Sequence, residues 1–432
     1  MVKRLNLINN SEFDEIKLLF RETLKRNIEI EDNVLSIIEN VKQNGDRAIL
    51  EYNRKFDNAD FPIGELRVSS SEIEMAKESV PKRFMKAIAS ASDRISKYHK
   101  LQLPEDNFFY DSIGMGLGHR WTSIAGVGIY VPGGTAVYPS SVLMNSIPAK
   151  VAKVDRIVMV VPAPNGIIDP IILATADIVG VKEIYKVGGA QAIAALAYGT
   201  ETISPVEKIV GPGNIYVATA KKQVFGHVGI DSFAGPSEIL VVADSSANPK
   251  WIAADLLSQA EHDVDAVPIL ICDDDGFSNE VEKYISLHLK GLNRADIALK
   301  SWEKNGLIIT LDNVINSGPI IDIIAPEHLQ LSIANPRDLI GKFRNAGSIF
   351  LGMYSPEALG DYIAGPNHVL PTSGTSRFAS GLSVLDFLKR SSIIESNKEA
   401  IEALSEDAMI IAESEGLSAH SLSIYSRIDK KK

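Results

Sequence analysis

Cysteine is almost absent from this 432-residue chain, in which Cys272 is the single example. One cysteine excludes a disulfide within the chain and any zinc site built from several cysteines, and it fits a reducing compartment. Cys272 ends the apolar run Val267–Cys272, which predicts a buried strand. We therefore interpret this thiol as an inert part of the core rather than as a nucleophile.

An excess of positive charge is also lacking. The chain has 44 lysines and arginines against 55 aspartates and glutamates, so its formal net charge is −11. A chain of this balance has no uniform basic field to attract nucleic acid or an anionic membrane. We therefore expect neither partner.

Continuous apolar segments that could target or span a membrane are missing as well. The first ten residues have no apolar stretch typical of a secretory signal before Glu12 and Asp14, so we expect a cytoplasmic protein. The long uncharged stretch 121–149 could cross a bilayer by length, but Pro132, Pro139 and Pro148 would interrupt a helix there.

The apolar pattern predicts an α/β protein with two units. The first hundred residues have helical spacing, and from about residue 150 apolar strands alternate with helical runs at a nearly constant spacing, beginning at Val154, Val181 and Val206. A second series of buried strands follows, at 239–243, 267–272, 307–311 and 348–351. After Leu385 we expect a helical tail that is too short to form its own core and must pack on another domain or subunit.

No Gly-x-Gly-x-x-Gly dinucleotide fingerprint follows any of these strands. Gly211-Pro-Gly-Asn214 lies at a strand-to-helix junction, where free backbone N–H groups can hold a phosphate or a ribose. A plain turn explains the same residues equally well.

Two other polar segments could carry chemistry. Gln259 and His262 are three residues apart near a helix end, where they could share a metal ion or simply cap the helix. Glu327 and His328 follow Pro326, and adjacent side chains in an extended segment point in opposite directions, so they could serve two proton transfers or form an ordinary surface pair.

The eight histidines divide into two groups. Four occupy loops or helix ends that could be functional: His262, His328, His368 and His420. The loop with His368 also contains Asp361, a plausible ligand or proton carrier. We interpret the other four as surface residues: His99, His119, His227 and His288.

Taken together, these segments resemble the histidinol dehydrogenase family over nearly the whole chain. The matching stretches, in order, are Gly126-Val-Gly-Ile-Tyr130-Val-Pro-Gly-Gly134, Gly188-Gly-Ala-Gln191, Gly211-Pro-Gly-Asn214, Ala234-Gly-Pro-Ser237-Glu, Gln259-Ala-Glu-His262-Asp, Ala325-Pro-Glu327-His328-Leu, Gly365-Pro-Asn-His368 and Ser383-Val-Leu-Asp-Phe. The resemblance implies two Rossmann-like domains that lack the glycine fingerprint, formed by residues 24–129 with 237–381 and by residues 130–236. It also implies terminal helical segments at 1–23 and 382–432, the second of which forms the dimer.

The resemblance further implies a zinc- and NAD-dependent homodimer that oxidises L-histidinol through L-histidinaldehyde to L-histidine. It places the zinc ligands at Gln259, His262, Asp361 and His420, with His420 reaching the partner's site. It makes Glu327 and His328 the acid–base residues. The NAD contacts are Tyr130, Gln191 and Asn214, and the substrate contacts are Ser237, Glu415, His328 and the zinc ligands, with His368 as a neighbour.

Those residue types suit the reaction. A neutral imidazole such as His328 can accept the proton of an alcohol near neutral pH, and a carboxylate such as Glu327 can activate the water that hydrates an aldehyde. There are two alternatives, of which only the first needs the acid–base residues. One is a zinc hydrolase, in which Glu327 activates water and His328 protonates the leaving group. The other is a non-catalytic module that binds small amines.

Overall fold

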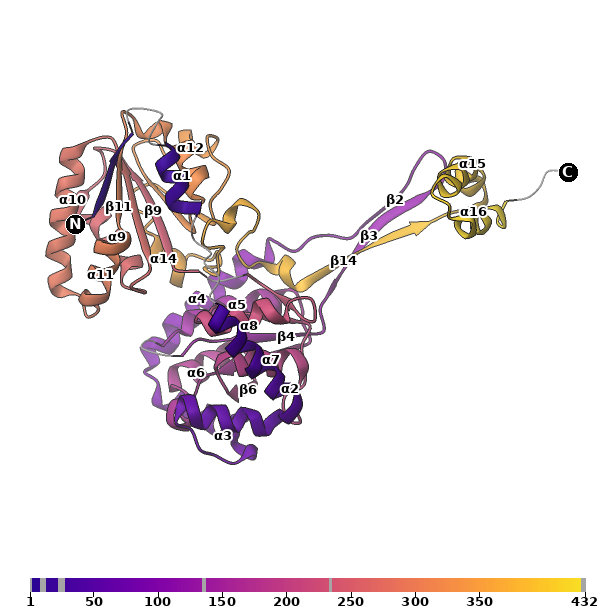
Figure 1. Cartoon of the computed structure of the whole chain (residues 1–432), viewed down its shortest axis with the longest axis horizontal. Helices are drawn as coiled ribbons and strands as arrows, with labels where there is room; N and C mark the ends of the chain where they lie inside the picture. The colour runs from indigo at the N-terminus through magenta and orange to yellow at the C-terminus, as the bar shows by residue number, and fades with distance from the viewer. Residues whose placement is uncertain (1, 8–12, 22–27, 134–136, 233–234, 429–432) are drawn as a thin grey trace.

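The computed structural model describes residues 2–7, 13–21, 28–133, 137–232 and 235–428. Gly134 and Ala234 of the quoted segments lie outside the described residues. Figure 1 shows two α/β lobes, each built around its own sheet, and a long arm that carries the C-terminal helices away from both lobes.

The first lobe contains a five-stranded parallel sheet in the order β6-β5-β4-β7-β8. From the central strand β4 the chain adds β5 and then β6 on one side, and it then adds β7 and β8 on the other side. The strand order therefore changes direction between β4 and β7. The strands are β4 (Gly126–Tyr130), β5 (Arg156–Val161), β6 (Glu183–Lys186), β7 (Lys208–Val210) and β8 (Gly229–Ile230). The crossover helices are α5 (Pro139–Val151), α6 (Pro170–Val179), α7 (Gly189–Tyr198) and α8 (Ile215–Val224).

Alternation along the strands explains how this sheet is covered. Met159 and Val161 of β5 pack in one apolar cluster with α5 and α6, whereas Val158 and Val160 pack in another with α7 and α8. Because both faces are buried, the strand is an unbroken run of apolar residues rather than an alternating one.

The second lobe contains a six-stranded parallel sheet in the order β1-β11-β10-β9-β12-β13. Its strands are β1 (Lys3–Asn6), β9 (Glu238–Ala243), β10 (Val267–Cys272), β11 (Leu307–Thr310), β12 (His328–Ser332) and β13 (Ser348–Leu351). Its helices are α1 (Phe13–Arg21), α9 (Pro249–Ala260), α10 (Asp275–His288), α11 (Ala295–Asn305), α12 (Gly318–Ile324), α13 (Arg337–Ile340) and α14 (Glu357–Tyr362). Apart from the edge strand β1, the order repeats that of the first sheet, with the change of direction between β9 and β12. Cys272 is fully buried, as predicted.

The N-terminal segment is not purely helical, which corrects the prediction for residues 1–23. Its strand β1 pairs in parallel with β11, from Lys3 beside Leu307 to Asn6 beside Thr310. Four residues with two basic side chains give no apolar run, and the partner strand lies about 300 positions further along the chain, so local sequence could not reveal the pairing.

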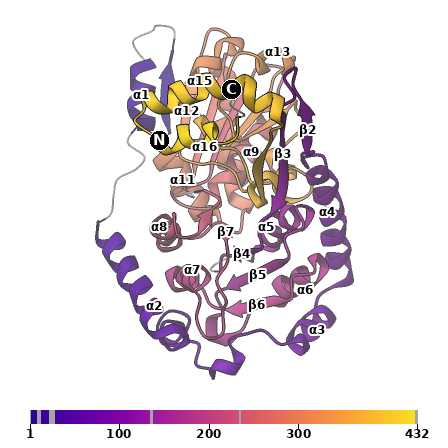
Figure 2. The same cartoon turned by 90° about the vertical axis from the view of Figure 1, so that its right-hand side faces the viewer.

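The helices that follow also differ from the predicted grouping of 24–129 with 237–381. They are α2 (Ile28–Asp57), α3 (Ser70–Ser79) and α4 (Lys82–Lys100). Helix α2 packs on α7 and α8, α3 packs on α6, and α4 packs on α5, so all three add an outer layer to the five-stranded lobe. Figure 2 shows this layer around the lower lobe.

The arm is built from three antiparallel strands and two helices. Strand β3 (Gly116–Ser123) lies between β2 (Asn107–Tyr110) and β14 (Leu388–Glu395), and the tip carries α15 (Lys398–Ser414) and α16 (Ser418–Tyr425). The predicted C-terminal tail therefore begins with a strand rather than a helix. Exposed apolar side chains line the arm, among them Ile394, Ile411 and Leu422.

No helix among the described residues is long and apolar enough to cross a membrane.

His99 was predicted at the surface, but the structure buries it fully on α4, where Nδ1 lies 2.9 Å from the Ile95 carbonyl oxygen. The buried face of α4 repeats at helical spacing through Ile88, Ala91, Ile95 and His99, which explains the difference.

Candidate active site

The predicted acid–base residues lie at the amino ends of β9 and β12, where the strand order of the six-stranded sheet changes direction. His328 opens β12 and pairs with Ile239 of β9. Helix α9 runs back along the sheet and brings Gln259 to the same end, and α14 returns there after β13. In Figure 1, α14 lies at the end of this lobe that faces the five-stranded lobe.

Glu238 holds both Glu327 and His328 through its backbone. Its N–H donates to Glu327 Oε2 over 2.9 Å, and its carbonyl oxygen lies 2.9 Å from His328 Nδ1. The carbonyl can only accept, so Nδ1 carries the proton and Nε2 keeps a lone pair. Glu327 Oε2 is 3.7 Å from His328 Nδ1, so no hydrogen bond joins the two side chains.

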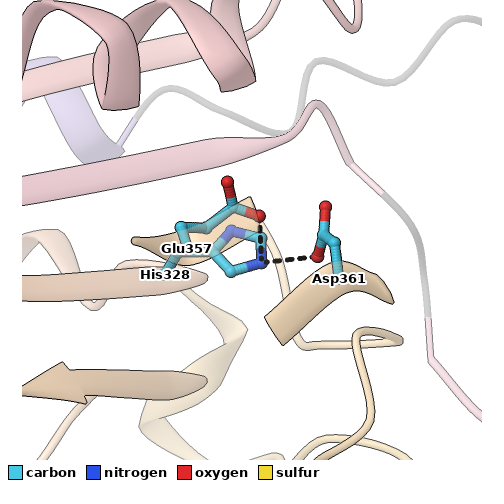
Figure 3. A group of neighbouring side chains, drawn as sticks. All are labelled: His328, Glu357 and Asp361. Carbon is cyan, nitrogen blue, oxygen red and sulfur yellow. Dashed lines mark ion pairs between the residues drawn. The ribbon is translucent and has the colours of Figure 1, made fainter. Parts of the chain in front are cut away.

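His328 Nε2 faces two carboxylates, one of which the sequence analysis missed. It lies 3.8 Å from Glu357 Oε1 and 3.7 Å from Asp361 Oδ1. Dashed lines mark these two pairs in Figure 3. Glu357 is buried at the start of α14, where an acidic residue is common for dipole reasons alone, so its sequence position carried no signal.

Neighbouring side chains fix the position of Glu357. Ser258 Oγ donates to Glu357 Oε2 over 3.1 Å, and the Glu357 N–H donates to Gln330 Oε1 over 3.2 Å. Gln330 in turn donates through Nε2 to Asp255 Oδ2 over 2.6 Å. The carboxylate that faces His328 is therefore held by α9 and β12 together.

Burial controls the ionisation of the acid–base pair. It raises the pKa of Glu327 well above its usual value, and the charges of Glu238 and Glu357 raise it further. It also lowers the pKa of His328, which keeps the imidazole neutral near pH 7. A carboxyl of raised pKa and a neutral imidazole can each exchange protons near neutral pH.

The two α14 carboxyls shift in opposite directions. Burial and the charge of Glu357 raise the pKa of Asp361. Burial also acts to raise the pKa of Glu357, but the charge that His328 carries when it is protonated and hydrogen bonds from Asp361 and Ser258 lower it overall. One proton on Asp361 therefore lets the neighbouring Glu357 stay ionised.

Of the four predicted zinc ligands, Asp361 lies in this cluster, and Gln259 and His262 lie at the end of α9 that reaches it. Gln259 is 1% exposed, Asp361 faces His328, and the charge of Glu357 acts on both His262 and His328. Within this cluster, three buried polar atoms have no hydrogen-bond partner among the described residues: Gln259 Nε2, His328 Nε2 and Glu357 Oε1. A buried set of imidazole, amide and carboxylate groups with unpaired atoms fits a divalent cation such as zinc. Among the described histidines, cysteines and acids, the group close enough to hold an ion is His328, Glu357 and Asp361.

The other predicted substrate and metal residues divide between this cluster and the arm. Ser237 directly precedes β9, and His368 Nδ1 lies 3.0 Å from the Asp361 carbonyl oxygen, where burial lowers the His368 pKa to about 4. Glu415 and His420 are exposed at the tip of the arm, away from α14 in the same chain. One chain alone does not bring them to the cluster.

The predicted NAD residues come together at the carboxyl ends of the five-stranded sheet. Tyr130 ends β4, and its hydroxyl accepts the Gly189 N–H over 3.1 Å; burial raises the Tyr130 pKa to about 12. Gln191 is buried in the first turn of α7, beside Gly189. Asn214 caps α8 by accepting the N–H groups of Tyr216 and Val217.

The fold and the cluster define an α/β protein with two parallel-sheet lobes and buried acid–base groups where one sheet faces the other lobe. A family model described as histidinol dehydrogenase matches residues 20–428. The chain is 52% identical over 403 residues to histidinol dehydrogenase of Rhodospirillum rubrum, which covers 93% of each chain. It is 51% identical over 432 residues to that of Rhizobium meliloti, which covers 99% of each.

A solved structure agrees with these sequences. The crystal structure of histidinol dehydrogenase from Elizabethkingia anophelis matches with a TM-score of 0.94 at 37% identity, over 99% of this chain and 98% of that one. The chain belongs to the histidinol dehydrogenase family, oxidoreductases that catalyse the last steps of histidine biosynthesis, from histidinol to histidine.

Proposed function

We propose that this protein oxidises L-histidinol to L-histidine through L-histidinaldehyde, with two successive hydride transfers to two NAD molecules and with one zinc ion per subunit. The observation that carries the proposal is the buried cluster in which Glu327, His328 and Asp361 meet with unpaired polar atoms. Family membership supplies the substrate and the product.

His328 is the proposed base for the hydroxyl proton. Its Nδ1 proton is held by the Glu238 carbonyl, so the free Nε2 can accept a proton when a hydride leaves the alcohol carbon. The ionised Glu357, 3.8 Å from Nε2, would stabilise the resulting imidazolium.

Glu327 is the proposed base for the second half of the reaction. The aldehyde must gain water before it can lose another hydride, and a carboxylate can remove a proton from that water. Its raised pKa suits this role, because the same group can hold the proton and release it near neutral pH. Both bases are anchored by the backbone of Glu238, so the two proton transfers share one rigid support.

Gln259, His262 and Asp361 would hold the zinc ion, with His420 of the second copy as the fourth ligand. The imidazole and carboxylate donors of the set support this assignment. When bound, zinc would fix the imidazole and amine of histidinol so that the reacting carbon is positioned between His328 and NAD.

The crevice between β4 and β7 is the proposed NAD site, formed by the unit 130–236. Ligands of open α/β sheets bind outside the carboxyl ends of strands where the strand order changes direction, and Tyr130 and Asn214 flank that point. Glycine lets the loop approach the end of β4 closely, because a Cβ at Gly211 would lie 2.1 Å from the Tyr130 carbonyl oxygen.

A homodimer completes the proposal. The arm places Glu415 and His420 away from their own cluster, and its exposed apolar side chains would be buried against a second copy. Ser237 and Glu415 are the proposed further substrate contacts. The cytoplasm is the proposed location, because the one cysteine is free and buried.

The test combines an absorbance assay with metal analysis on one purified sample. Histidinol with NAD should generate two NADH per histidinol, with about one zinc ion per chain. Turnover of an ester or amide without NADH would instead support the zinc hydrolase. Zinc-dependent amine binding without any turnover would support the binding module.

A further inference from the structure

A buried ion pair lies directly behind the loop that the proposed function assigns to NAD. Lys221 of α8 pairs with Asp231, which follows β8, and their side chains are only 2% and 4% exposed. Neither residue has been given a role in the proposed function.

Both members of the pair hold the backbone of the same residue, Gly211. Asp231 Oδ2 accepts the Gly211 N–H over 2.8 Å, and Lys221 Nζ donates to the Gly211 carbonyl oxygen over 3.0 Å. Gly211 adopts a φ of 112°, a conformation that glycine tolerates and other residues avoid. Each polar group of this unusual residue is therefore held by a charged side chain.

Stability alone does not account for such a pair. Replacing a buried ion pair by apolar residues of similar size is often neutral or stabilising, because two charges must be removed from water. What a buried pair can supply is a defined geometry. Here the geometry is that of the loop from Gly211 to Asn214, which ends where Asn214 caps α8.

We propose that Lys221 and Asp231 are positioning residues for the cofactor: by fixing Gly211 from both sides, they hold the Gly211-Pro-Gly-Asn214 loop in the shape that receives NAD. The inference rests on the proposed function, which places NAD in this crevice. Neither side chain needs to touch NAD, since both lie beneath the loop.

The decisive variant is the charge-balanced double change Lys221→Met with Asp231→Asn. It leaves no unpaired buried charge, so the protein should fold, but the Gly211 carbonyl loses its donor. We expect the NAD dissociation constant, measured by calorimetry on the zinc-loaded enzyme without histidinol, to rise about tenfold, or about 1.4 kcal/mol. The KM for NAD should rise in parallel, whereas kcat at saturating NAD and the KM for histidinol should not change.

Two comparisons separate positioning from general stability. Asp231→Asn alone keeps an acceptor for the Gly211 N–H and should weaken NAD binding less than the double change. Glu183→Gln breaks the Arg156–Glu183 pair (2.7 and 3.0 Å) at the amino ends of β5 and β6, the opposite end of the same sheet. It should lower the melting temperature without weakening NAD binding.

The results that overturn the inference are distinct from those that overturn the proposed function. Wild-type NAD affinity in the double variant, or an equal loss in Glu183→Gln, would refute positioning by the ion pair. A wild-type enzyme that binds no NAD would refute the proposed function and this inference with it.

Discussion

Replacing Glu327 by glutamine should make the protein more stable and less active at the same time. The carboxyl is buried and its pKa is raised, so the ionised form is costly in the folded state. Glutamine has the same shape, carries no charge, and keeps an oxygen that can accept the Glu238 N–H now bonded over 2.9 Å.

The sign of the stability effect follows from proton linkage. Below the unfolded pKa, both states of wild-type Glu327 are protonated and the substitution should have little effect. As the pH rises, the folded state must either keep a proton that the unfolded state has lost or bury a charge, so wild-type stability falls. Each unit of upward shift corresponds to about 1.4 kcal/mol. A gain of that size should raise Tm by roughly 3–6 °C for a unit of 150–250 residues.

The assay is thermal unfolding of chelator-treated protein from about pH 4.5 to 8. Glu357→Gln is the matched control: it is a buried carboxyl of the same cluster, but its pKa is lowered. Its ionised form therefore stabilises the fold above the unfolded pKa, and Glu357→Gln should lower Tm near pH 7. A loss of Tm near pH 7 in Glu327→Gln as well would contradict the charge argument.

Kinetics on the same Glu327→Gln protein test its chemical role. Loss of a general base typically reduces a rate by about 100-fold to 10,000-fold. The aldehyde step, measured with histidinal and NAD, should slow far more than the alcohol step, measured with histidinol. Equal losses on both substrates would show that Glu327 does not act by activating water.

Three further results are expected. His328→Asn should slow both oxidation steps, because each departing hydride requires a proton acceptor; a variant at wild-type speed would remove His328 from the mechanism. Chelation should abolish NADH production and zinc should restore it, and His262→Ala should behave like the stripped protein; full activity in metal-free protein would end the zinc assignment. Hybrid dimers of His262→Ala with His420→Ala should recover activity, since one of the two shared sites would be intact; hybrids no better than either parent would place His420 in its own subunit's site.

Long apolar runs predicted much of the core. The runs at 239–243 and 267–272 became central strands because a parallel strand that is covered on both faces must be apolar throughout. Edge strands do not show such a continuous apolar run. Strand β1 is mostly exposed and depends on a partner distant in sequence, and β14 is a mostly exposed strand of the arm. Their formation is a tertiary effect that local pattern does not encode.

The candidate site was predicted unevenly for a related reason. Motif resemblance identified Glu327, His328 and Asp361, which the structure brings together. It missed Glu357, because a glutamate after a proline at a helix start is common on any protein surface. Burial distinguishes this residue, and burial arises only when α14 folds back against α9 and β12.

The two sheets have the same strand order, but their proposed functional residues lie at opposite ends of the strands. The proposed NAD residues follow the rule that ligands bind at the carboxyl ends of strands, whereas Glu238 and His328 lie at the amino ends of β9 and β12. Hydride transfer requires cofactor and base to meet, so the carboxyl end of one sheet must face the amino end of the other. Hydrogen bonds connect the lobes near this junction: for example, Arg94 Nε donates to the Ile363 carbonyl over 2.7 Å, and Asn367 Nδ2 donates to the Met144 carbonyl over 2.6 Å. Asp361, in the last turn of α14, and His368 lie next to Ile363 and Asn367 in the chain, so the position of the five-stranded lobe also sets the position of these two site residues.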